Sequence, residues 1–206
     1  KRDDIEIIRV KLWYEMIKYR LSLASSYQIE KVLEPMSFKR NDNGERYNNN
    51  KWSKYQSGLH TPNSRTISLV ESQVPESSKM INSIFWEALR GEKGVDWLIK
   101  KGEEYLPWNI KRILYQPNKN GLSYELVNNL NSKQIHKLEN FAGLDSLAAL
   151  IIFLRFADSK NYRTAAFDIG CSIYRLLLVA STFPYYREHN AELLQLMKRY
   201  VFPLAH

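Results

Sequence analysis

Cysteine is nearly absent from this chain of 206 residues, because Cys171 is the only one. A single cysteine excludes a disulfide within the chain and predicts a reducing compartment, which we take to be the cytoplasm. Its position in an apolar segment is typical of a small buried hydrophobic residue, and a catalytic nucleophile is the alternative.

Glycine and proline are also scarce, with 8 and 7 residues. Those numbers are low for an all-β sandwich, which needs many tight turns. The long apolar segments repeat with the helical period instead. The sequence therefore predicts an all-α fold.

Motifs that carry chemistry are missing as well. The sequence contains no glycine-rich phosphate loop and no G-x-S-x-G motif. The histidines lack the spacing of zinc ligands; they are His60, His136, His189 and His206. We therefore predict no catalytic residue, no metal and no cofactor, and an α-helical enzyme is the lowest ranked of three hypotheses.

No long apolar run lacks charged residues. The most apolar segment, 165–183, contains Asp168 and Arg175, which favours a core helix over a membrane span, so no membrane partner is expected. Together with Arg155 and Asp158 on the preceding helix, these charges predict buried or interfacial ion pairs. A ligand pocket is the alternative.

The charge that is present is basic, +8 from 30 basic and 22 acidic residues, which is compatible with a polyanionic partner. Half of this excess falls between Ser37 and Arg65, where the net charge is +4. The charged residues of that span are Lys39, Arg40, Arg46, Lys51, Lys54 and Arg65 against Asp42 and Glu45. Binding to phosphates requires such a concentration of charge.

The N-terminal region reads as four helices. The first carries an apolar stripe made of Ile5, Ile8, Leu12, Met16, Tyr19 and Leu23. The second begins at Ser25 and Gln28, which have capping-box spacing, and ends before Pro35. Its inward residues are predicted to be Ile29, Val32 and Leu33. The polar segment 36–48 is either a loop or a small hairpin.

The third helix lies in the stretch NNNKWSKYQSGLHTP, residues 48–62. Asparagines begin it and Gly58 ends it. Trp52 and Tyr55 can point inward while Lys51 and Lys54 point outward. Thr61 and Pro62 read as the N-cap and first residue of a fourth helix.

This arrangement resembles the helix-turn-helix of the lambda-repressor/Cro class of DNA-binding proteins. The matching residues are Gln28, Ser53, Lys54, Tyr55, Ser57, Gly58 and Pro62. The stretch is also similar to the N-terminal part of a group of bacterial proteins with a tryptophan–tyrosine–glycine–proline run. The match covers about a quarter of the chain, and roughly a dozen extra residues separate helices two and three, where the class has a tight turn of three or four. The insertion could add a DNA-contacting wing.

The resemblance implies that the third helix enters the major groove of duplex DNA. Base reading then falls to Asn49, Asn50 and Lys51, because asparagine pairs with adenine and lysine with guanine. Phosphate contacts fall to Lys39, Arg40, Arg46 and Lys54, and Lys51 could serve in either role. The alternative from the residues alone is a loop and helix cap followed by two core aromatics, and a true helix-turn-helix could also serve protein contact.

The second region begins near residue 77. Predicted helices cover 80–89, 95–105, 109–115, 123–130, 132–141, 144–157, 164–182 and 191–202. Trp86, Trp97 and Trp108 are predicted to build its core; a stacking platform for bases would need them exposed.

The sequence therefore predicts two domains, an N-terminal helix-turn-helix module at 1–76 and a C-terminal helical bundle at 77–206. The bundle would serve oligomerisation or regulation, or bind a protein partner. We predict a non-enzymatic bacterial transcriptional regulator that binds double-stranded DNA, and a homodimer would suit two half-sites. The second hypothesis is an accessory or adaptor protein of a mobile-element or antiphage system that binds another macromolecule through a basic surface.

Overall fold

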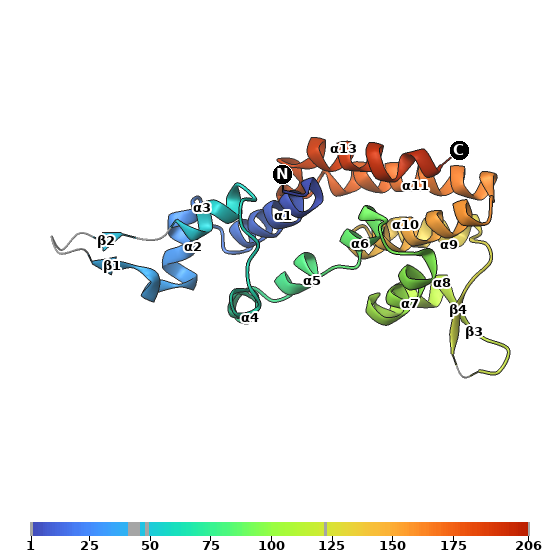
Figure 1. Cartoon of the computed structure of the whole chain (residues 1–206), viewed down its shortest axis with the longest axis horizontal. Helices are drawn as coiled ribbons and strands as arrows, with labels where there is room; N and C mark the ends of the chain where they lie inside the picture. The colour runs from blue at the N-terminus through green and yellow to red at the C-terminus, as the bar shows by residue number, and fades with distance from the viewer. Residues whose placement is uncertain (1, 41–45, 48–49, 122, 206) are drawn as a thin grey trace. The chain divides into compact units, whose positions relative to one another are not determined.

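The computed structural model describes residues 2–40, 46–47, 50–121 and 123–205, with the backbone alone at 39–40 and 46–47. This part of the chain is mostly helical, as predicted, with two short antiparallel hairpins (Figure 1). The chain divides into two compact units. The first comprises residues 1–82 with 184–189, and the second comprises residues 83–183 with 190–206. The domain boundary after residue 76 stays a prediction.

The first unit is built around its N-terminal helix, α1, which packs against α3, α5 and α12. Its elements are α1 (Asp4–Arg20), α2 (Ser26–Leu33), η1 (Pro35–Ser37), β1 (Lys39–Arg40), β2 (Arg46–Tyr47), α3 (Lys51–Gln56), α4 (Ser64–Gln73), α5 (Ser77–Ile81) and α12 (Pro184–Arg187). The predicted hairpin alternative for the polar segment is confirmed, since β1 and β2 pair antiparallel with Lys39 opposite Tyr47.

Helix α1 is buried on more than one face, which suits a central helix. Asp3 caps it by accepting a hydrogen bond from the Ile5 amide. Most of the predicted stripe is buried, but Tyr19 is 51% exposed. Trp13 and Tyr14, which lie outside that stripe, are fully buried and face α3 and α2.

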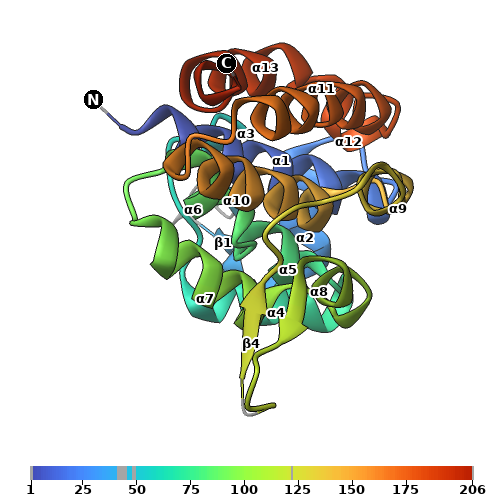
Figure 2. The ribbon, with the colours of Figure 1, turned by 90° about the vertical axis from the view of Figure 1, so that its right-hand side faces the viewer.

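The second unit is built around α10, which contacts α6, α7, α8, α9 and α11 (Figure 2). Its elements are α6 (Phe85–Arg90), α7 (Val95–Tyr105), α8 (Trp108–Leu114), β3 (Tyr115–Pro117), β4 (Tyr124–Leu126), α9 (Ser132–Asn140), α10 (Leu144–Ser159), α11 (Arg163–Ala180), α13 (Asn190–Tyr200) and η2 (Phe202–Leu204). Apolar residues on all sides of α10 fit its burial among the other helices.

Two of the predicted helices are wrong. Segment 123–130 contains the strand β4, which pairs with β3 so that Tyr115 lies opposite Leu126. Segment 80–89 is divided between α5 and α6, which a short turn separates. In the first case pairing with a strand nine residues away satisfies the backbone, and a helical reading of one segment cannot detect that.

The predicted buried ion pairs are also wrong in part. Asp168 is exposed, and Arg155 donates to three backbone carbonyls, those of Ala88, Leu89 and Tyr200, at 2.7, 3.1 and 3.2 Å. Burial lowers the pKa of Arg155. Arg175 does form an interfacial pair, since its guanidinium lies 2.8 Å from Glu139 on α9.

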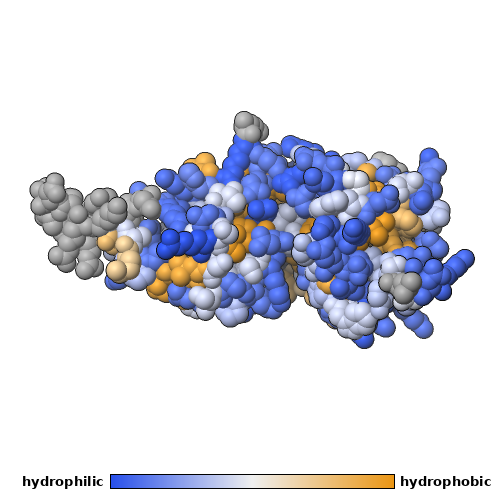
Figure 3. All heavy atoms as spheres, turned by 60° about the horizontal axis from the view of Figure 1, so that its bottom comes forward, coloured by the Kyte–Doolittle hydropathy of each residue, from blue (hydrophilic) through white to orange (hydrophobic). Residues whose placement is uncertain are grey.

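The tryptophans of the second unit divide between core and surface. Trp86 is buried as predicted, whereas Trp97 and Trp108 are 37% and 63% exposed, so the core prediction is wrong for these two. On the surface shown in Figure 3, hydrophobic residues form separate patches among hydrophilic ones. Among the described residues, no helix combines the length and the apolar character that a bilayer span requires.

Candidate nucleic-acid interface

Helix α2 has the start and end that the sequence predicts. The Ser25 hydroxyl accepts a hydrogen bond from the Gln28 amide, and the Gln28 side chain accepts one from the Ala24 amide. Ile29 and Leu33 are buried, but Val32 is 46% exposed, so its predicted inward orientation is wrong. Val32 lies three residues after Ile29, at the edge of the buried face.

Three aromatic rings fix α3 against α1. Trp13 stacks on Trp52 with centroids 5.9 Å apart and an angle of 15° between the rings, and Tyr55 meets both rings edge-on. Trp13 and Trp52 are fully buried and Tyr55 is 3% exposed, which confirms the inward orientation of both α3 aromatics. Aromatic pairs of this geometry add about 0.5–1.5 kcal/mol beyond the area that they bury.

A polar network fixes the N-terminal end of α3. Lys51 Nζ donates to both carboxylate oxygens of Glu34 at 2.8 and 3.1 Å and to Thr66 Oγ1 at 2.9 Å. The Trp52 indole N–H donates to the same carboxylate at 2.9 Å. Glu34 is the C-cap of α2 and Thr66 lies in α4, so this network joins three helices.

A second polar chain joins α1, α2 and the end of α3. Ser26 Oγ lies 2.8 Å from the Tyr14 hydroxyl and donates to Gln56 Oε1 at 2.8 Å. Burial raises the pKa of Tyr14, and the hydrogen bond to Ser26 opposes that shift. Both ends of α3 are therefore fixed through side-chain hydrogen bonds.

The C-terminal end of α3 forms a Schellman motif. The Leu59 amide donates to the Lys54 carbonyl and the Gly58 amide to the Tyr55 carbonyl, at 2.8 and 3.0 Å. Gly58 has φ +69°, and a Cβ there would lie 2.7 Å from Cγ2 of Ile7 on α1. Only glycine allows this conformation and this approach together.

The start of α4 differs from the prediction. Asn63, not Thr61, is the N-cap, and its side chain accepts a hydrogen bond from the Thr66 amide at 2.9 Å. The Thr61 hydroxyl instead donates to Glu6 on α1. The loop after α3 is thereby fixed to α1.

The opposite face of α3 is exposed. Ser53, Lys54 and Ser57 line it. The Ser57 hydroxyl donates to the Ser53 carbonyl at 3.0 Å, so it remains close to the helix. Lys54 is therefore the long cationic side chain that this face presents.

The structure describes the predicted site residues to different extents. Asn49 lies outside the described residues, and for Lys39, Arg40 and Arg46 the structure gives the backbone of the hairpin but no side chains. Asn50 is exposed and adopts a left-handed conformation at the start of α3. Base contact by these residues and phosphate contact by the others stay predictions.

For Lys51, the structure shows partners that bear on its predicted base-reading role. Its ammonium is bound to Glu34 and Thr66, and the ring of Tyr55 lies 5.9 Å away. Base contact by Lys51 stays a prediction that would require it to leave these partners. Lys54, which is exposed, is available for the predicted phosphate contact.

Two exposed cations of the first unit, Lys31 and Arg65, had no assigned role in the predicted site. Lys31 is on α2, which packs against α3, and Arg65 precedes Thr66, to which Lys51 donates. Arg65 was part of the charge excess in the sequence. Lys31 lies outside the basic span 37–65 from which the predicted phosphate contacts were taken.

Glu30 adds an acidic group beneath this interface. It is 1% exposed and accepts a hydrogen bond from the Ser37 hydroxyl at 3.0 Å. Burial raises the pKa of Glu30. Burial likewise raises the pKa of Tyr55, against a hydrogen bond to Thr66. Both groups are therefore buried on the side of α3 away from its exposed face.

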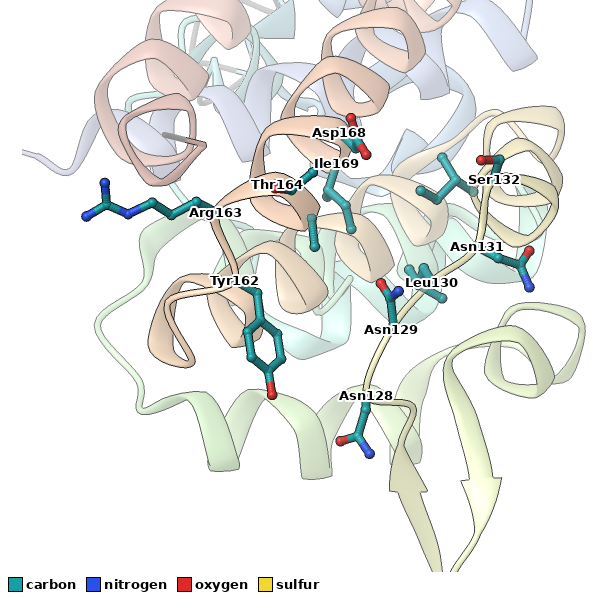
Figure 4. A pocket seen from close by; sticks show the side chains of 12 residues that line it. Asn128, Asn129, Leu130, Asn131, Ser132, Tyr162, Arg163, Thr164, Asp168 and Ile169 are labelled. Carbon is teal, nitrogen blue, oxygen red and sulfur yellow. The ribbon is translucent and has the colours of Figure 1, made fainter.

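The second unit contains a cavity of about 700 Å³ between α9, the segment before it and α11 (Figure 4). Arg163 and Asp168 are the charged side chains of its lining, and in Figure 4 Arg163 points away from the cavity. Within the described residues, no three histidine, cysteine, aspartate or glutamate side chains gather as metal ligands would. We assign no chemistry to this cavity.

Comparison of the chain with models of known families, with curated proteins and with solved structures finds no match.

Proposed function

We propose that the first unit binds duplex DNA through the exposed face of α3, and that the chain is a non-enzymatic bacterial transcriptional regulator. One observation carries this proposal: α3 is fixed on one face by the Trp13–Trp52–Tyr55 cluster while the other face presents Lys54 to solvent. A helix that enters a groove needs a rigid base and an exposed polar face.

The dimensions of α3 agree with this role. A helix with its side chains is about 10–12 Å across, which matches the width of the major groove, about 12 Å. At its start, the chain leads to the β1–β2 hairpin, which extends beyond α2 and α3 (Figure 1). We propose that this hairpin, with Lys39, Arg40 and Arg46, contacts the backbone phosphates beside the groove.

The base-reading role is proposed for the start of α3. Asn49 and Asn50 precede the helix and would meet base edges first. Lys51 could join them only after exchanging its carboxylate partner for a guanine or a phosphate. In the geometry described above, Lys51 positions the helix, and Lys54 and Arg65 supply the outward charge.

Selection from a pool of random duplexes, followed by affinity measurements at several salt concentrations, tests the proposal. We expect binding to weaken steeply as salt rises. Lys54→Ala should lower affinity by about tenfold and reduce the salt slope by about 1. Lys79→Ala is the matched control, because Lys79 is an exposed lysine on α5. Failure to bind any duplex at low salt would refute the proposal.

A protein-binding adaptor of a mobile-element or antiphage system is the second candidate. The observation that favours it is the exposure of apolar residues on α2 and η1, where Tyr27, Val32 and Met36 are 54%, 46% and 93% exposed. An apolar contact would persist at salt concentrations that release DNA. Replacement of Met36 by glutamate should weaken such a complex and leave DNA binding unchanged.

A further inference from the structure

Helix α11 carries a row of exposed apolar residues. Phe167, Tyr174 and Leu178 are 57%, 48% and 52% exposed, and Cys171, also partly exposed, lies between them. The spacing of four, three and four residues places all of them on one face of the helix. The opposite face packs on α10 (Figure 2).

The row continues onto the C-terminal segment. The Tyr174 ring contacts the Phe202 ring in η2, with centroids 6.3 Å apart. The C-terminal segment approaches α11 closely at Gly170, where an added Cβ would collide with Cβ of Ala205. Side chains of this size, half exposed, form an apolar patch of about 300–400 Å², which is in the range of the largest, often functional, patch on a typical monomer.

We propose that this face binds a second copy of the chain, with the two α11 helices antiparallel about a two-fold axis beside the midpoint of residues 171 and 172. In this register Phe167 faces the space between the partner's Tyr174 and the partner's Leu178. Phe167, Cys171 and Tyr174 then each fit between two residues of the partner's row, as in packed helix pairs, and Leu178 packs at its end beside the partner's Phe167.

The charges on the flank of the row select this arrangement. Asp168 and Arg175 lie seven residues apart on one side of the row. The two-fold axis sets Asp168 opposite the partner's Arg175 and repeats the pair by symmetry. A parallel two-fold pairing would put the charged flanks of the two helices on opposite sides of the seam, so Asp168 and the partner's Arg175 could not pair. One register therefore satisfies the apolar row and the charges together.

Arg175 keeps hydrogen-bond donors for this contact. Glu139 holds its guanidinium at 2.8 Å and Ser172 accepts a hydrogen bond from it at 2.9 Å. A guanidinium carries five donors, so a second carboxylate can bind without displacing Glu139. The dimer does not depend on the proposed function, although it would give a DNA-binding protein two modules for two half-sites.

The molar mass of the full chain in solution, measured without DNA across a range of concentrations, provides the first test. We expect a dimer, and Leu178→Glu should raise its dissociation constant at least tenfold. Leu59→Glu is the matched control, since Leu59 is 66% exposed in the other unit. A monomer at every concentration would overturn the proposal, as would a dimer that Leu178→Glu leaves intact.

Cross-linking tests the register. Cys171 lies one helical rise, about 1.5 Å, from the partner's Cys171 along the axis, so mild oxidation or a short bis-maleimide should link the native dimer. In a Cys171→Ser background, Asp168→Cys and Arg175→Cys should cross-link only when both are present. Cross-linking of either single variant would indicate a different pairing and overturn the register. DNA binding is measured separately, so failure here leaves the proposed function untouched.

Discussion

The ammonium of Lys51 lies 2.8 Å from Oε1 of Glu34, and the same carboxylate accepts the indole N–H of Trp52. One acidic side chain at the end of α2 therefore holds two consecutive residues of α3. Both charged side chains are largely shielded, at 25% and 19% exposure, so their attraction is screened less than that of a surface pair.

We expect Lys51→Met to lower the free energy of unfolding by about 1–2 kcal/mol, because Glu34 loses its cationic partner. The double variant with Glu34→Gln should cost less than the sum of the two single changes. Urea denaturation of the four proteins measures this coupling. Lys79→Met, which removes an exposed pair with Glu76, should change stability by less than about 0.5 kcal/mol. A similar small effect for Lys51→Met would mean that the pair does not hold α3.

Among the residues of α3, Trp52 is predicted to contribute most to the free energy that holds this helix against α1. Trp52→Ala removes a fully buried ring that stacks on Trp13 and should cost about 3–5 kcal/mol. Trp52→Phe keeps most of the ring but loses the hydrogen bond to Glu34, so a smaller loss of about 1–2 kcal/mol is expected. Thermal and chemical denaturation measure both. A melting temperature that Trp52→Ala leaves unchanged would contradict the burial of this ring.

Gly58 and Gly121 form a matched pair for separating backbone strain from steric contact. Both have positive φ, +69° and +67°, but only at Gly58 would a Cβ collide with Ile7. Gly121→Ala should therefore cost about 1 kcal/mol, whereas Gly58→Ala should cost about 3 kcal/mol because the α1–α3 contact must also open. Equal effects on the free energy of unfolding would show that α3 does not approach α1 this closely.

Glu71 should make the stability of the first unit depend on acid pH. Its carboxylate accepts hydrogen bonds from the amides of Ser78 and Glu76 and from the Ser77 hydroxyl, which lowers the pKa of Glu71 to about 2. A lowered pKa stabilises the fold above the unfolded value of about 4.3, and this stabilisation is lost as the pH falls toward 2.

Glu71→Gln should therefore lower the free energy of unfolding by about 1 kcal/mol at neutral pH, since solvent screens this partly exposed carboxylate. The difference from the unmodified chain should shrink as the pH falls below about 4. Denaturation at several pH values measures it, with the exposed Glu92→Gln as control. A difference that stays constant down to pH 2 would contradict the role of these hydrogen bonds.

The local signals in the sequence predicted many of the helices. Helix α7 has the bounds that its periodicity indicates, and Ser25 caps α2 as its spacing with Gln28 suggests. These features depend on residues within one or two turns of each other, so a short stretch of sequence contains all the information. Gly58 belongs to the same group, because its conformation is set by the Schellman motif that it completes.

The roles of the charged and aromatic side chains could not be read in this way. Helical spacing directs Lys51 away from the core, yet its partner Glu34 is 17 residues away and reaches it through the packing of α2 on α3. Trp108 resembles a core residue by type, but the helix that carries it leaves the ring exposed. Only the relative placement of helices decides such cases.

The sequence by itself determined the mostly helical fold, many of the helix ends and the pair of aromatics that α3 buries, because these follow from side-chain periodicity and backbone capping over a few residues. The tertiary structure decided which cations remain exposed, that Arg155 binds backbone carbonyls and that α11 presents an apolar row. Each of these depends on segments distant in sequence, whose approach is set by the packing of the whole core.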